Sequence, residues 1–224
     1  MNLLIGKEEV INVSEEELEK GLMSSGPKGK TYRVGDKVLK IYSDCNVPGR
    51  IGGSEVLGVV GIPTKRTLLP EGIIRDSDTL NFMGVFREFI PDTWSFDAIP
   101  YVSMKRFLDE LELLETDMKT LADNHVFVDD LVSENALYNG ELYVCDSGRF
   151  SLRRDSKAGM ILESNIGQLN SFVLDELFHL VPLDYGKREE FNAQFDRTQN
   201  LSSQMRKDVL PGESVKQYII RKVS

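Results

Sequence analysis

The sequence changes character near residue 100. Before this point, short apolar and β-branched runs alternate with glycine and proline, a pattern typical of strands joined by turns. After it, apolar residues recur at helical spacing over long stretches. We therefore expect an α+β protein with two lobes, a strand-rich one followed by a mainly helical one.

The clearest helix is expected between Ser103 and Asn124. Its apolar residues are spaced by four, three, four and three positions, which places them on one helical face: Phe107, Leu111, Leu114, Met118 and Leu121. The opposite, polar face is expected to carry Asp109, Glu112 and Asp117. A similar stripe predicts a helix beyond residue 164, and shorter helices are expected near residues 191–195 and 215–221.

The first half carries the strand and turn signals. Ser14 and Glu17 have the spacing of a capping box, which predicts the start of a short helix. Residues 22–42 predict two strands joined at Gly35 and Asp36, where glycine supplies the positive φ of a hairpin turn. A brief helix is expected to start at residues 54–57, and further strands at residues 67–74 and 82–90.

Composition excludes several classes of protein. The 224-residue chain has a net charge of −9, which argues against a general DNA or RNA coat, because nonspecific affinity for polyphosphate depends on Lys and Arg. Two cysteines without a CxxC pair and two histidines make a disulfide framework or a structural zinc site implausible. No apolar run approaches the roughly 20 residues of a membrane span, and the first residues lack the basic flank of a signal peptide. We therefore expect a cytoplasmic protein without nucleic-acid or membrane partners.

Two patterns in the first half could bind an anion. The segment Ser24-Ser25-Gly26-Pro27-Lys28-Gly29 is expected at a strand-to-strand turn, where backbone N–H groups can approach phosphate oxygens. The same composition is also typical of an ordinary loop. Lys40 lies within an apolar strand and needs either water or an anionic partner. If a protein carboxylate from the following helix pairs with it, Glu55 is the sole candidate.

Two patterns in the second half supply oxygen ligands. Asp130 and Asn135 follow an apolar run and are five residues apart, so a carboxylate could orient a hydroxyl while an amide oxygen binds a hard cation such as Mg²⁺. Asp146 ends a second strand-like run and could supply another metal carboxylate. Each pattern taken alone also fits a polar turn.

The order of these patterns resembles the signature set of protein kinases: a glycine loop, a strand lysine, a helix acid, a long helix, Asp-x₄-Asn and Asp-x-Gly. The chain resembles a small bacterial-type member of the protein-kinase-like superfamily over about residues 22–148. The resemblance implies a bilobal α+β fold. Its N-lobe, an antiparallel sheet with the glycine-rich loop and a short helix, would span residues 1–90, and a reduced helical C-lobe with the catalytic and metal-binding loops would span residues 91–224.

The resemblance also implies roles for individual residues. Gly26 and Gly29 resemble glycines of the phosphate-covering loop, Lys40 the lysine that pairs with the phosphates, and Glu55 the helix acid that holds that lysine. The backbone C=O of Glu88 and N–H of Ile90 would meet adenine at the hinge. Asp130 matches the catalytic aspartate, while Asn135 and Asp146 match the metal ligands.

The sequence departs from the family's motifs at Ser24, Arg87, Val128, Asp129, Val132 and Ser147. The arginine that grips a phosphorylated activation loop is replaced by Asp129, which argues against that form of control. No Ala-Pro-Glu follows Gly148, so the family's peptide-docking platform is expected to be largely missing.

The expected function is an ATP- and Mg²⁺-dependent phosphotransferase that acts on a protein hydroxyl of the Ser/Thr type. Two alternatives remain open: a pseudokinase that binds nucleotide or a partner without transfer, and a small-molecule phosphotransferase. The resemblance to minimal kinases also leaves open export as an effector without a cleavable signal.

Overall fold

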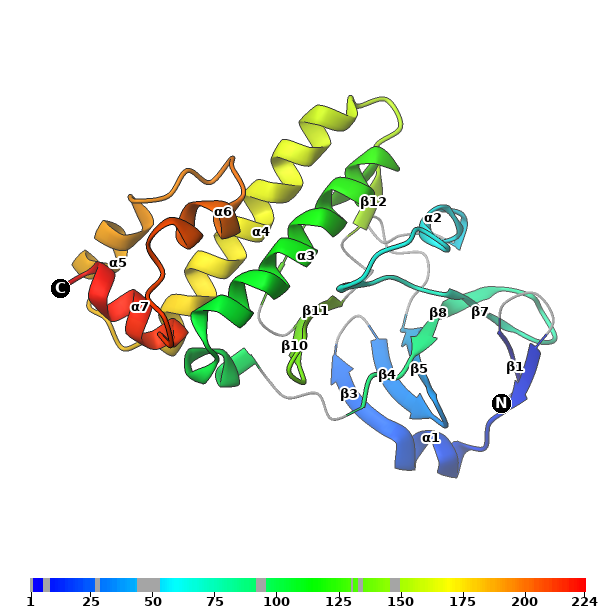
Figure 1. Ribbon diagram of the computed structural model, residues 1–224. Helices are drawn as coiled ribbons and strands as arrows, with labels where there is room; N and C mark the ends of the chain where they lie inside the picture. Colours follow the sequence, from blue (N-terminus) through cyan, green and yellow to red (C-terminus); the bar gives the residue numbers. More distant parts are fainter. Residues whose placement is uncertain are drawn as a thin grey trace. The chain divides into compact units, whose positions relative to one another are not determined.

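The computed structural model describes residues 2–5, 9–26, 29–43, 53–91, 96–129, 131–132, 135–145 and 150–224. They form a mixed α+β structure with an antiparallel sheet in the N-terminal part and helices in the C-terminal part (Figure 1). The described chain divides into a first unit within residues 1–62 and 69–91, and a second unit within residues 63–68, 92–146 and 150–224. The α+β class expected from the sequence is confirmed.

The first unit is built on an antiparallel sheet with the strand order β2-β1-β7-β8-β5-β4-β3. Its strands are β1 (Asn2–Ile5), β2 (Glu9–Asn12), β3 (Leu22–Gly26), β4 (Gly29–Val34), β5 (Lys37–Tyr42), β7 (Gly72–Asp76) and β8 (Phe82–Glu88). The turn between β4 and β5 is the expected one at Gly35 and Asp36, and Gly35 has a φ of 62°. This positive φ explains the glycine at that position.

Two helices belong to the same unit. Helix α1 (Glu15–Gly21) starts at Ser14, and the expected capping box with Glu17 is present. The apolar core on the α1 side of the sheet is formed by Leu3, Val13, Leu39 and Ile74, and Leu18 of α1 packs against it. Helix α2 (Gly53–Val59) packs against β7 and β8 and buries Val56 and Val59.

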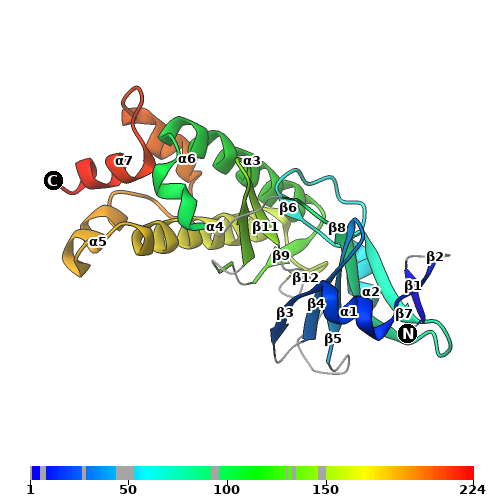
Figure 2. The ribbon, with the colours of Figure 1, turned by 90° about the horizontal axis from the view of Figure 1, so that it is seen from below.

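The second unit is organised around two long helices. Helix α3 (Met104–Asp123) lies between its caps Ser103 and Asn124, the bounds expected from the sequence. The predicted apolar stripe from Phe107 to Leu121 is at most 2% exposed. Helix α4 (Ala158–Leu180) packs along α3 in both ribbon views (Figures 1 and 2). The remaining helical elements are η1 (Phe96–Tyr101), α5 (Tyr185–Asn192), α6 (Leu201–Met205), η4 (Arg206–Asp208) and α7 (Val215–Lys222).

Short strands complete the second unit. Strand β9 (Val126–Val128) pairs antiparallel with β12 (Phe150–Leu152). Strand β10 (Ala136–Tyr138) pairs antiparallel with β11 (Leu142–Cys145), which also pairs in parallel with β6 (Thr67–Leu68). The strands at 126–128 and 142–144 were expected from the sequence.

Several expectations about local structure are wrong. Residues 22–42 form three strands, because β3 and β4 are separate and pair at Gly26 and Gly29. Residues 67–74 do not form one strand, since β6 pairs with β11 while β7 pairs with β8. The helix expected at 191–195 is α5, which ends at Asn192. Asp117 is only 1% exposed, so it does not belong to the polar face of α3.

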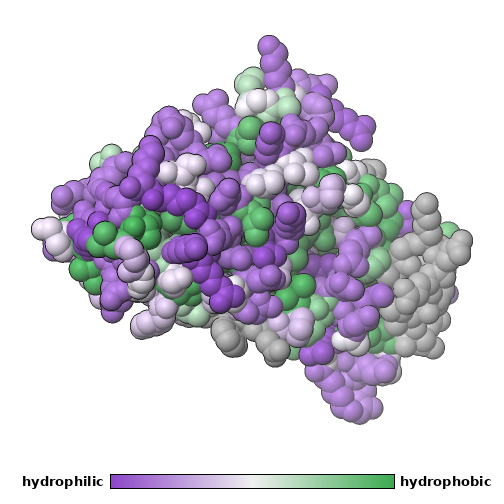
Figure 3. Space-filling view, in the orientation of Figure 1, coloured by the Kyte–Doolittle hydropathy of each residue, from purple (hydrophilic) through white to green (hydrophobic). Residues whose placement is uncertain are grey.

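The face of the protein drawn in Figure 3 is mainly hydrophilic, with apolar residues in smaller groups between polar ones. This surface agrees with a composition in which 28% of the residues are charged. Among the helices that the structure describes, none has both the length and the apolar character needed to cross a bilayer.

Candidate functional site

The two glycines of the predicted phosphate loop have different surroundings. Gly26 ends β3 and pairs with Gly29, the first residue of β4; Pro27 and Lys28 lie outside the described residues. Gly29 has a φ of 153°, and a Cβ added there would lie 2.3 Å from the backbone oxygen of Ile41. A Cβ added at Gly26 would meet nothing within 4 Å. Gly29 therefore permits the close approach of β4 to β5, whereas Gly26 borders open space that a ligand could use.

Lys40 lies in the interior of this sheet. It is half-buried in β5, opposite Thr31 of β4 and Val85 of β8. The strand period places Lys40 on the same face as Val38, whereas Leu39 belongs to the core beneath α1. The amine therefore extends from the sheet face opposite the α1 core. Glu55 lies within α2, and only its backbone is described.

The predicted hinge lies at the end of β8 and is fixed by neighbouring backbone and side-chain groups. The N–H of Glu88 donates to Oε1 of Glu71 at 2.8 Å, and the N–H of Phe89 donates to the backbone oxygen of Asp36 at 2.7 Å. The backbone oxygen of Glu88 accepts from Nη1 of Arg87 at 3.0 Å. A carbonyl oxygen has two lone pairs, so this contact leaves room for a second donor. Ile90 is half-buried next to this fixed segment.

Asn135 lies at one end of a strand ladder. It directly precedes Ala136, which pairs with Val144 across β10 and β11. Cys145 ends β11, and Asp146, which lies outside the described residues, is the next residue in the chain. The register therefore brings the start of β10 and the end of β11 together, at the positions next to the two predicted metal ligands.

The predicted catalytic loop begins at the end of β9. Val128 pairs with Phe150 of β12 and is followed by the exposed Asp129. Asp130 lies outside the described residues, as do Ser133 and Glu134. Further along the loop, the N–H of Asn135 donates to the backbone oxygen of Val132 at 2.9 Å. The described ends of the loop are thus held by β9 and by the turn that starts β10.

A buried asparagine that the motif analysis missed supports β9. Asn165 of α4 is fully buried; its Oδ1 accepts from the N–H of Val128 at 2.9 Å, and its Nδ2 donates to the backbone oxygen of Val126 at 3.0 Å. The available signal was an amide at four-residue spacing between the apolar residues Ile161 and Leu169.

An ionic cluster lies beside the β10–β11 ladder. Nε of Arg66 contacts Oε2 of Glu110 at 2.6 Å, and its Nη2 contacts Oε1 of Glu141 at 2.9 Å. Tyr143 donates its hydroxyl to Glu141. Burial, together with that hydrogen bond, raises the pKa of Tyr143 to about 12, so this hydroxyl stays protonated at neutral pH. The cluster therefore stabilises the ladder, and Tyr143 is unsuited to act as a base there.

The predicted site residues fall in both units. Gly26, Gly29, Lys40, Glu55, Glu88 and Ile90 belong to the first unit, and Asn135 belongs to the second. Within the described ranges, no group of three or more His, Cys, Asp or Glu side chains could hold a metal ion. An amide oxygen at Asn135 and a carboxylate at Asp146 are hard oxygen donors of the kind Mg²⁺ takes, and the ladder register suits such a pair.

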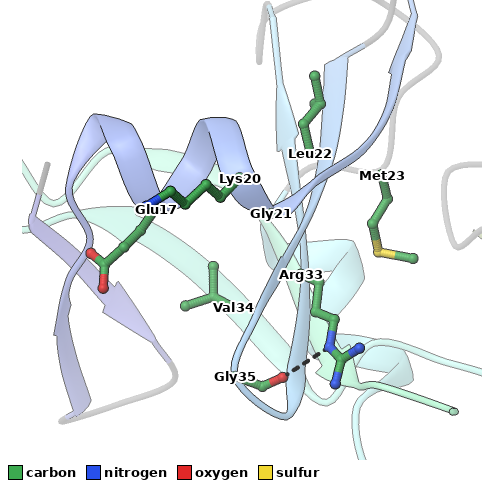
Figure 4. A pocket seen from close by; sticks show the side chains of 8 residues that line it. All are labelled: Glu17, Lys20, Gly21, Leu22, Met23, Arg33, Val34 and Gly35. Carbon is green, nitrogen blue, oxygen red and sulfur yellow. Dashed lines mark hydrogen bonds between the residues drawn. The ribbon is translucent and has the colours of Figure 1, made fainter.

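An open hollow in the first unit lies away from these residues. It is formed where α1, β3 and β4 meet, and Nε of Arg33 donates there to the backbone oxygen of Gly35 at 3.2 Å (Figure 4). Its lining residues are Glu17, Lys20, Gly21, Leu22, Met23, Arg33, Val34 and Gly35. None of the predicted site residues belongs to this lining.

No protein-family model matches the chain, and no curated protein matches it.

Proposed function

We propose that the protein is an ATP- and Mg²⁺-dependent phosphotransferase of the protein-kinase-like type, acting on a hydroxyl group of a protein. The observation that carries the proposal is the arrangement of the strand ends in the second unit. Val128 pairs with Phe150, and Ala136 pairs with Val144. The loop that contains Asp130 and Asn135 is therefore tethered at both ends to strands that flank Asp146. A catalytic aspartate and two metal ligands need this kind of proximity.

The first unit supports the same proposal. Gly26 ends β3, Gly29 begins β4, and Lys40 lies in the next strand, β5. Helix α2, which contains Glu55, follows β5 in the chain. In protein kinases, the lysine that pairs with the ATP phosphates also lies on the third strand, counted from the strand before the glycine-rich loop. The open space at Gly26 would let backbone N–H groups approach a phosphate.

Each residue would contribute a separate part of the chemistry. Lys40 would bind the phosphates, and Asp130 would orient the acceptor hydroxyl and take its proton. The acceptor oxygen forms a bond to the γ-phosphorus while the bond from that phosphorus to the β,γ-bridging oxygen breaks, and ADP leaves. Mg²⁺ held by Asn135 and Asp146 would offset the charge of the triphosphate. Catalysis would thus consist mainly of positioning and charge neutralisation.

The proposal is tested by phosphate transfer from ATP labelled at the γ-position, in the presence of Mg²⁺ and a panel of acceptor proteins. Label is expected on protein with the wild type and is expected to be lost in Lys40→Ala, Asp130→Asn and Asp146→Ala. Two control variants remove the same charge nearby: Lys37→Ala on the same strand and Asp129→Asn in the same loop. Both should retain transfer.

The alternatives give different results in the same assay. Equal label in the wild type and in all three site variants would overturn the proposal. Mg²⁺-dependent ATP binding without turnover would favour a pseudokinase, for which Val132 and Ser147 are the relevant departures. ADP release that requires an added small molecule, with no label on protein, would favour a small-molecule phosphotransferase.

A further inference from the structure

Asp117 holds three successive backbone amides. Its carboxylate is buried in the middle of α3, at 1% exposure. Oδ1 accepts from the N–H of Lys65 at 2.8 Å, and Oδ2 accepts from those of Arg66 at 2.6 Å and Thr67 at 2.7 Å. A buried carboxylate needs such partners, because it has lost its hydration. Three consecutive amides bound to one carboxylate also fix the path of the backbone that carries them.

That backbone segment, residues 63–68, is called the strap below. It belongs to the second unit and ends in β6, which pairs in parallel with β11 through Thr67 with Val144 and Leu68 with Cys145. The N–H of Val144 donates to the backbone oxygen of Arg66 at 2.8 Å. The strap therefore forms one side of the support for the last residues of β11.

The side chain of Arg66 attaches the strap a second time. It pairs with Glu110 of α3, and the same Glu110 accepts from the N–H of Leu142 at 3.2 Å. Arg66 and Asp117 therefore restrain the same strap from two sides. Asp117 fixes the backbone of residues 65–67 directly, and through the β6–β11 pairing it fixes the strand end at Cys145.

We propose that Asp117 is a positioning residue for Asp146, the predicted metal ligand that follows Cys145. The carboxylate fixes the strap, the strap fixes the end of β11, and the end of β11 sets where the next residue begins. This inference rests on the proposed function, because it assumes that Asp146 binds the metal of a nucleotide complex. Residues that orient metal ligands by direct hydrogen bonds typically change metal affinity about 10- to 100-fold when mutated, and this range sets the scale for Asp117, which acts through the strap.

The test compares Asp117→Asn with Asp123→Asn, which removes the same charge from an exposed position at the end of α3. Asparagine has one acceptor oxygen, and its NH₂ group would face backbone donors. Hydrogen exchange should therefore accelerate at residues 65–67 and 142–145 in Asp117→Asn only. The Mg²⁺ concentration for half-maximal ATP binding, measured by calorimetry on the full chain, should rise about 10- to 100-fold in the same variant.

The outcomes separate the two proposals. Wild-type binding of Mg²⁺ and ATP with an unchanged Mg²⁺ requirement in Asp117→Asn would overturn the positioning role alone. A wild-type chain that binds no ATP would overturn the proposed function, and the positioning role with it. If Asp117→Asn does not fold, Glu110→Gln loosens the same strap through Arg66 and should raise the Mg²⁺ requirement in the same direction. An unchanged requirement in that variant would also overturn the inference.

Discussion

Asn165 and Val128 are joined by a buried hydrogen bond from the backbone N–H of Val128 to Oδ1 of Asn165, at 2.9 Å. The amide group of Asn165 also donates to the backbone oxygen of Val126. One side chain of α4 therefore satisfies both ends of β9, the strand that leads into the predicted catalytic loop. A buried backbone group without a partner is costly, so this amide stabilises the strand in its position.

Replacement of Asn165 by leucine is predicted to destabilise the protein strongly. Leucine has the same branching at Cγ but leaves the N–H of Val128 and the oxygen of Val126 without the partners that Asn165 provides. At about 1–3 kcal/mol for each of these two buried polar groups, the free energy of unfolding should fall by about 2–6 kcal/mol. Urea denaturation measures the change. Glu163→Ala, an exposed change two residues earlier on α4, should stay within about 0.5 kcal/mol of wild type, and equal stability of the two variants would contradict the role of Asn165.

The two glycines of the predicted phosphate loop should respond differently to alanine. Gly29→Ala is expected to lower the free energy of unfolding by about 1–3 kcal/mol, because the residue has a φ of 153° and its Cβ would collide with the oxygen of Ile41. Gly26→Ala should change stability by less than about 1 kcal/mol, since its Cβ meets no atom within 4 Å.

Gly26→Ala should lower nucleotide affinity although it changes stability little. In Gly26→Ala, a folded protein would carry a methyl group in the space proposed for phosphate, so ATP affinity is expected to fall about tenfold, equivalent to ~1.4 kcal/mol. Calorimetric titration with ATP and Mg²⁺ measures this. Unchanged ATP affinity in a Gly26→Ala chain of normal stability would remove this glycine from the phosphate loop.

Stability is expected to depend on the ionisation of a buried glutamate. Glu115 of α3 is 3% exposed and accepts hydrogen bonds from the backbone N–H and the hydroxyl of Ser202 in α6. Burial raises the pKa of Glu115 above its ordinary value of 4.5, although the hydrogen bonds from Ser202 act in the opposite direction. A carboxyl group whose pKa is higher in the folded protein contributes stability below its unfolded pKa. That contribution is lost as the pH rises through the folded pKa.

Glu115→Gln should therefore gain stability relative to wild type as the pH rises from 4.5 through the raised pKa. Glutamine keeps both contacts, since its oxygen can accept from the N–H of Ser202 and its NH₂ group can donate to the hydroxyl. Thermal unfolding over a pH series measures the difference, with the exposed Glu163→Gln as the control. A difference between Glu115→Gln and wild type that does not change with pH would show that Glu115 is not the titrating group.

The parts of the fold that could be predicted from the sequence are those set by local signals. The bounds of helix α3 are predicted correctly, because Ser103 caps its start and its apolar stripe has an unbroken period up to Leu121. The turn at Gly35 followed from the conformational freedom of glycine. In both cases the deciding interactions lie within a few residues of each other.

The wrong predictions concern residues whose interaction partners are distant in the sequence. Asp117 has the spacing of a buried position, three residues after Leu114 and four before Leu121, but a carboxylate is buried there only because the strap supplies its amides. The sequence also predicts one strand for residues 67–74, but Thr67 and Leu68 pair with β11. No local pattern identifies a partner that far along the chain. For the candidate site, the sequence indicates which residues could bind nucleotide and metal. The strand register adds that Asn135 directly precedes Ala136, which pairs with Val144 near the end of β11.

The central claim is that Lys40 meets the phosphates of a bound nucleotide whose metal is held by Asp146. An acyl-phosphate derivative of ATP tests it directly, because a lysine amine close to the phosphates attacks the acyl carbon and ATP leaves. Peptide mapping by mass spectrometry should find Lys40 acylated in preference to Lys37. Excess ATP with Mg²⁺ should protect Lys40 in the wild type and much less in Asp146→Ala. Acylation of Lys40 no greater than that of Lys37, with no protection by ATP, would contradict the account.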